Sequence, residues 1–108
     1  MGVALVIELE GMNESMYVEL CERVELHNDP PEGLIFHGVG PSPGGWRIVD
    51  VWDTEERWDE YFAETVKPAL DEIAREHGYD AVERSQVTRW DIEGYTFGPG
   101  PLVNSAGM

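Results

Sequence analysis

Two short apolar segments joined by a turn-forming linker constrain the fold of this chain more than any other feature. Residues 34–39 (LIFHGV) and 46–52 (WRIVDVW) are rich in the branched and aromatic side chains that favour β-strands. The six residues between them, 40–45, are all glycine, proline or serine. So short a linker cannot make the crossover that parallel strands require. The two strands must therefore be antiparallel neighbours, and this hairpin is the middle of a sheet-based fold.

The rest of the chain supplies two more strands and two helices. Residues 3–9 form a short aliphatic strand, and residues 82–92 form a more polar one. Asn13 caps the first helix, whose apolar side chains recur at helical spacing and belong to the core. These side chains are Met16, Tyr17, Leu20, Cys21 and Val24.

The second helix begins at Asp53 or Thr54 and stops at Gly78. Pro68 lies inside its apolar stripe and is expected to kink or split the helix near Val66, because proline removes a backbone donor and crowds the preceding turn. The element order β-α-β-β-α-β predicts an α+β, ferredoxin-like fold with a four-stranded antiparallel sheet.

The size and charge of the chain exclude several classes of function. Its 108 residues hold one core, which we assign to residues 1–93, followed by a Gly/Pro-rich C-terminal arm over residues 94–108. Seven basic against 22 acidic residues give a net charge of −15, which repels nucleic acids and anionic membranes. A single cysteine suits a reducing cytoplasm, and no His or Cys set has metal-ligand spacing, so no bound metal is expected. The apolar run 3–7 stops at Glu8 and is expected to be neither a signal peptide nor a membrane span, which predicts a soluble, cytoplasmic protein.

The strands are apolar on both faces, which one copy of this fold cannot bury. Ile48 and Trp52 lie on one face of their strand, whereas Val49 and Val51 lie on the other. Two helices cover only one face of a four-stranded sheet, and strands that are apolar on both sides are buried on both sides. We therefore predict a homodimer that packs sheet face against sheet face.

His37 and Asp50 are the candidate catalytic residues. We favour a hairpin register in which Gly40 pairs with Gly45, which puts His37 on the same face as Asp50, together with Ile35 and Val39; a slip of one residue reverses this. Histidine is a common general base, so His37 could take a proton from a phenol or an enolisable carbonyl, with Asp50 orienting the imidazole. The alternative is a hydrogen-bonded interior histidine at the dimer face, since buried polar groups are often simply satisfied.

Aromatic side chains near the hairpin are candidates for the walls of a substrate pocket. They are Trp46, Trp52, Trp58 and Tyr61. Trp52, Trp58 and Tyr61 could present flat surfaces to an aromatic ligand, and Trp46 shares the strand face of Trp52, although aromatic residues at strand or helix spacing are more often core residues.

Polar residues alternate along the last predicted strand. This row consists of Arg84, Gln86, Thr88 and Trp90. Either the row lines a wet cavity, where Arg84 and Trp90 would contact a substrate, or the strand is an edge strand whose polar side faces solvent, which is the simpler interpretation.

A family resemblance lies in three segments: GLIFHGVGP (33–41), GGWRIVDVWDTEERWDEYF (44–62) and PAL (68–70). They resemble the dimeric α+β barrel superfamily, near the antibiotic biosynthesis monooxygenase domains and related short actinobacterial proteins. The resemblance extends over residues 3–92, and its most specific part is the step from Asp50 and Trp52 into a helix. It implies a dimeric barrel with a pocket between the sheet and the helices of each subunit.

The superfamily is a scaffold with several uses, among them cofactor-independent oxygenation of aromatic polyketides, haem degradation and muconolactone isomerisation. Its haem-degrading branch uses an Asn, a Trp and a His together; no such trio matches here, so no cofactor is expected. The resemblance implies a cofactor-independent monooxygenase that acts on an aromatic or polyketide-like substrate. The alternative is a non-catalytic, dimeric small-molecule-binding or accessory protein.

Overall fold

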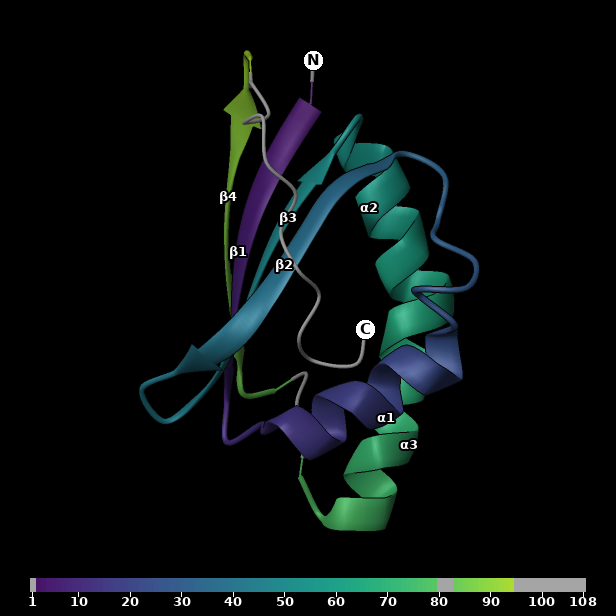
Figure 1. The fold of residues 1–108 in the computed structure, drawn as a ribbon, viewed down its shortest axis with the longest axis vertical. Helices are drawn as coiled ribbons and strands as arrows, with labels where there is room; N and C mark the ends of the chain where they lie inside the picture. The colour runs from purple at the N-terminus through teal and green to yellow at the C-terminus, as the bar shows by residue number, and fades with distance from the viewer. Residues whose placement is uncertain (1, 80–82, 95–108) are drawn as a thin grey trace.

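In residues 2–79 and 83–94, which the computed structural model describes, every helix packs on one face of a four-stranded sheet (Figure 1). The elements in chain order are β1 (Gly2–Glu10), α1 (Glu14–Val24), β2 (Leu34–Ser42), β3 (Gly45–Trp52), α2 (Glu55–Tyr61), the π-helical segment η1 (Phe62–Val66), α3 (Lys67–His77) and β4 (Ser85–Ile92). The strand order is β2-β3-β1-β4, and all neighbours are antiparallel. The predicted α+β, ferredoxin-like fold is confirmed.

β1 lies inside the sheet and carries the centre of the core. Val3 and Leu5 on its helix-facing side are 1% and 0% exposed. β1 pairs with β3 so that Leu5 lies opposite Asp50 and Ile7 opposite Ile48, and the side chains of both strands alternate together. The helices complete this core with Tyr17, Leu20, Cys21, Trp58, Ala69, Leu70 and Ile73.

The hairpin is tighter than the six-residue loop that the sequence predicts. Ser42 pairs with Gly45, which leaves only Pro43 and Gly44 in the turn. Gly44 has a φ of 80°, a conformation that glycine adopts without strain. β2 extends through Pro41 because β2 is an edge strand, where a missing backbone N–H need not break the ladder.

The predicted pairing of Gly40 with Gly45 is wrong, since Gly40 pairs with Arg47. The difference is two residues, and an even shift keeps every side chain on its predicted face. His37 therefore still shares the face of Asp50 and pairs with it directly.

A bulge changes the start of β2. The register shifts between Leu34 and Phe36, which puts Leu34 opposite Trp52 and leaves Ile35 outside the ladder. The predicted row of Ile35 and His37 on one face is therefore interrupted. Leu34 packs against the core at this end of the strand.

Pro68 divides the second helical region, as predicted. Thr54 caps α2 with its side chain. In η1 the amide of Lys67 donates to the carbonyl of Phe62, five residues earlier, and this wider turn accommodates the proline that follows. Gly78 ends α3 in the left-handed conformation, with a φ of 68°.

The C-terminal part of the chain is described as far as residue 94. β4 begins at Ser85, later than the predicted strand 82–92, and residues 80–82 lie outside the described residues. The predicted arm, 94–108, also lies outside them except for Gly94. None of the described helices has the length and apolar character of a membrane span.

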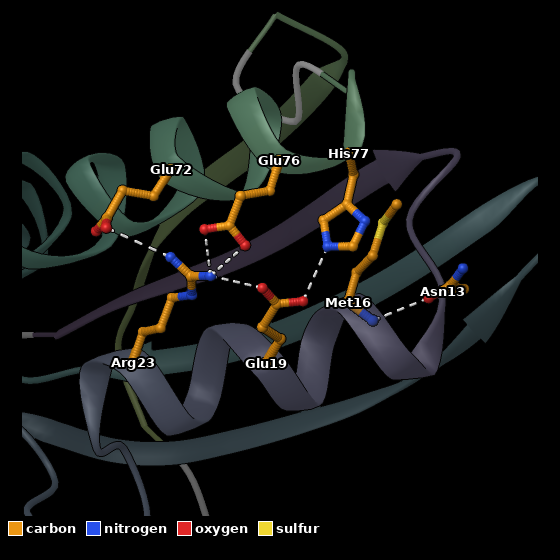
Figure 2. Close-up of polar contacts among 7 residues, drawn as sticks. All are labelled: Asn13, Met16, Glu19, Arg23, Glu72, Glu76 and His77. Atoms are coloured by element: carbon orange, nitrogen blue, oxygen red, sulfur yellow. Dashed lines mark hydrogen bonds and ion pairs between the residues drawn. The ribbon is translucent and has the colours of Figure 1, made fainter.

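A charged cluster joins α1 to α3 (Figure 2). Arg23 donates to Glu19 at 2.6 Å and to Glu76 at 2.7 Å, and Glu72 lies 3.4 Å away. Hydrogen bonds from His77 and then from Arg23 lower the pKa of Glu19. Glu19, Glu76 and His77 form the one group in the described residues with ligand atoms close enough to share a metal ion. Arg23 already binds both carboxylates, which makes the group an ion-pair cluster.

Arg23→Gln is expected to lower the melting temperature Tm at low salt, because three clustered carboxylates lose their shared cation. The loss should shrink in about 1 M NaCl, where charges are screened. The pKa of Glu19 is lower in the folded protein than in the unfolded chain, where it is about 4.3. Ionised Glu19 therefore stabilises the folded protein above this pH, and the stabilisation is lost as the pH falls through the folded pKa. The difference in Tm between Arg23→Gln and the wild type should therefore disappear in acid.

Lys67→Gln is the matched control, since it removes a single exposed ion pair with Asp71. Its Tm should not change measurably. A salt-independent loss in the Arg23 variant would contradict the electrostatic explanation and point to lost packing of the arginine stem.

Candidate functional site

Asp50 is the one buried charged side chain in the described residues, with 4% of its surface exposed. β3 places it on the helix-facing side of the sheet, in one row with Ile48 and Trp52, because side chains alternate along a strand. A carboxylate that leaves water without hydrogen-bond partners costs several kcal/mol. The neighbouring residues therefore have to supply partners for both of its oxygens.

Two side chains bind the Asp50 carboxylate. His37, directly opposite on β2, places Nδ1 2.6 Å from Oδ1 of Asp50. The indole Nε1 of Trp52 donates to Oδ2 at 3.2 Å. The structure thus brings together the two residues that the sequence predicts as a catalytic pair, and adds Trp52 as a second donor.

The other ring nitrogen of His37 is bonded to a residue of α1. The hydroxyl of Tyr17 hydrogen-bonds to Nε2 of His37, so both ring nitrogens have partners. With its proton on Nδ1, the ring donates to Asp50 and accepts from Tyr17. Burial, followed by a hydrogen bond to Cys21, raises the pKa of Tyr17 above its ordinary value and keeps the hydroxyl protonated. A polar chain, Tyr17–His37–Asp50–Trp52, therefore runs from α1 through β2 to β3.

This polar chain lies in the wall of an apolar cavity between the sheet and the helices. The cavity has a volume of about 70 Å³. Its lining includes Tyr17, Cys21, His37, Asp50, Trp52, Trp58, Tyr61 and Phe62. Ligand pockets usually begin at roughly 300 Å³, so a ring-sized ligand has to widen this cavity as it enters.

Three of the four predicted wall aromatics line the cavity. Trp52 packs against Trp58 and Tyr61, with ring centroids 5.9 Å and 5.5 Å away. Trp46 is buried elsewhere, against Tyr17 at 5.5 Å between ring centroids, and is not part of the cavity wall. Its surroundings are those of a core residue.

Arg84 and Trp90 lie away from the cavity. Trp90 pairs with Ala4 on the sheet face opposite the helices and is 50% exposed. Arg84 lies at the end of the sheet, 5.6 Å from the centre of the Tyr79 ring and 3.2 Å from Glu10. β4 is an edge strand and the side chains of its polar row are exposed, in agreement with the simpler of the two interpretations.

Tyr17 is the functional candidate that the sequence analysis missed. It belongs to the apolar stripe of α1 and is 1% exposed, so its ring is a core residue. The signal that could have revealed it is the hydroxyl, because a buried tyrosine usually has a hydrogen-bond partner. His37, the polar residue of an otherwise apolar strand, is such a partner.

Comparisons with known proteins agree with the fold. No protein-family model matches this chain, and no curated protein matches its sequence. In three dimensions the chain has the ferredoxin-like fold of antibiotic biosynthesis monooxygenase-like proteins.

Three solved structures illustrate the likeness. Rv0793 of Mycobacterium tuberculosis has a TM-score of 0.62 at 13% identity, over 90% of this chain and 100% of that one. A proposed antibiotic biosynthesis monooxygenase of Deinococcus radiodurans has a TM-score of 0.61 at 14% identity, over 93% and 100%. A variant of SnoaB, a cofactor-independent oxygenase of Streptomyces nogalater, has a TM-score of 0.58 at 11% identity, over 87% and 95%. At these identities the likeness establishes the fold alone.

Tyr17→Phe is expected to lower the free energy of unfolding by about 1–3 kcal/mol, because it leaves Nε2 of His37 without its partner. Tyr61→Phe is the matched control. The Tyr61 hydroxyl is buried and has no hydrogen-bond partner in the described residues, so its removal should be neutral or stabilising. Urea denaturation measures both variants. Equal losses would contradict the bond between Tyr17 and His37.

Proposed function

We propose that this protein is a small-molecule enzyme of the cofactor-independent monooxygenase type, acting on an aromatic or polyketide-like substrate between the sheet and the helices. The observation that supports it is the Tyr17–His37–Asp50 chain in the wall of an apolar cavity. Such a site combines a route for a proton with walls that exclude water from a reactive intermediate.

The proposed reaction begins with proton removal through Tyr17. The substrate carbon loses a proton to Oη of Tyr17 while the Tyr17 proton passes to Nε2 of His37, and Asp50 stabilises the resulting imidazolium. The substrate carbanion reduces dioxygen and forms a C–O bond, and the terminal peroxide oxygen takes the proton back. Cleavage of the O–O bond, with loss of the second hydrogen on that carbon, gives a carbonyl group and water.

The small cavity also favours a second candidate function, a non-catalytic dimeric binding or accessory protein. At about 70 Å³ the cavity is too small for a polycyclic substrate without movement of its walls. In this second function His37 and Asp50 only satisfy each other's hydrogen bonds in the core.

His37→Gln separates the two functions. In the enzyme, the glutamine cannot accept the proton as a base, and oxygen consumption with a panel of phenolic and polyketide-type substrates should fall by at least about a hundredfold. His77→Gln is the matched control, because His77 lies in the exposed cluster between α1 and α3, and its activity should equal that of the wild type. Equal turnover in both variants would contradict a catalytic role for His37.

We also propose that a second copy of the chain covers the free face of the sheet. Val49 on β3 and Trp90 on β4 are 36% and 50% exposed, and both belong to the face opposite the helices. Val6 of β1, the strand between β3 and β4, lies on the same face. An exposed apolar patch of this kind is typical of an interaction surface. Sheet-to-sheet packing of two copies would bury it on both subunits.

Val49→Lys is expected to convert the dimer to a monomer at micromolar concentration, because the dimer would have to bury two unpaired ammonium groups. Analytical ultracentrifugation should give about twice the 12.2 kDa chain mass for the wild type and the single mass for the variant. Ala63→Lys adds the same charge at an exposed position of η1 and should remain dimeric. A folded wild-type monomer would contradict the proposed assembly.

A further inference from the structure

Tyr61 holds an unused hydrogen-bond donor at the cavity. Three buried side-chain polar atoms lack a partner in the described residues: Tyr61 Oη, Trp46 Nε1 and Asp53 Oδ1. Of the three residues, only Tyr61 lines the cavity. A buried hydroxyl without a partner destabilises the folded protein, so a ligand that supplies an acceptor would recover a hydrogen bond that the free protein lacks.

The position of the Tyr61 ring is well defined. Tyr61 is the last residue of α2, and its ring packs against Trp52 at 5.5 Å between centroids. Burial raises the pKa of Tyr61 to about 12, so the hydroxyl remains a donor at neutral pH. Tyr17 and Tyr61 both belong to the lining of this cavity.

The two tyrosines differ in what their hydroxyls already bind. The Tyr17 hydroxyl is committed to His37, whereas the Tyr61 hydroxyl is free to bind a ligand. The cavity wall has no lysine or arginine among the described residues, and its one carboxylate, Asp50, is held by His37 and Trp52. A charged ligand would therefore find no counter-ion, and the wall favours a neutral one.

We propose that Tyr61 is a specificity-determining residue, whose hydroxyl donates a hydrogen bond to the ketone oxygen of a neutral, apolar ring ligand. This role of Tyr61 rests on the proposed function for the location of the ligand, and it adds the chemical class of the ligand. It places the acceptor oxygen at Tyr61 and leaves the Tyr17 end of the cavity to the group that loses a proton.

The test compares two probes of nearly equal shape, the bicyclic ketone 1-indanone and the hydrocarbon indane, by titration calorimetry. The wild type should bind 1-indanone about five- to tenfold more tightly than indane, the gain from one hydrogen bond. Tyr61→Phe should abolish this preference and retain indane affinity within about twofold. Tyr79→Phe is the matched control, since its hydroxyl donates to the backbone carbonyl of Glu10 outside the cavity, and it should keep the preference.

A ketone preference that survives in Tyr61→Phe would overturn the inference, and so would a wild type that binds neither probe or both equally. The measurement reports binding, so a failure to detect oxygen consumption leaves a Tyr61-dependent preference intact and rejects only the oxygenase. Turnover that depends on His37 without any Tyr61-dependent preference would retain the oxygenase and reject the role of Tyr61.

Discussion

A single buried carboxylate determines how this fold is arranged around its cavity. Asp50 has to satisfy two oxygens in an apolar interior, and it does so with His37 from β2 and Trp52 from its own strand. This requirement favours one hairpin register, because a one-residue slip would move His37 to the free face and leave the carboxylate without it. Tyr17 then connects α1 to the sheet through His37, so the same polar chain helps to position the helix layer.

The fold and the face shared by His37 and Asp50 could be predicted because both depend on local patterns. Element order follows from apolar periodicity and from breakers such as Pro68 and Gly78, and each of these acts where the sequence places it. The predicted loop was too long, yet the error in register was two residues. Since side chains alternate with a period of two, an even error leaves the face assignment unchanged.

The rest of the site could not be predicted because it depends on contacts between distant elements. Tyr17 has the spacing of a core residue, and only the packing of α1 over β2 brings its hydroxyl to His37. Trp46 and Trp52 share one strand face, yet only Trp52 reaches the cavity. The bulge between Leu34 and Phe36 follows Gly33, which has a φ of 95°, but a single glycine before a strand does not predict where the register shifts. The cavity volume depends on how all these side chains pack together, which no single segment encodes.

The partner behind each of the two cavity hydroxyls decides which of them can move a proton. The burial that raises the pKa of Tyr17 and brings that of Tyr61 to about 12 acts equally on any acid bound in the cavity. A bound phenol or carbon acid therefore keeps its proton unless a positive charge forms nearby. Behind Tyr17 the proton can rest on His37, where Asp50 balances the imidazolium. Tyr61 has no such acceptor behind it in the described residues, so it can donate a hydrogen bond but cannot relay a proton.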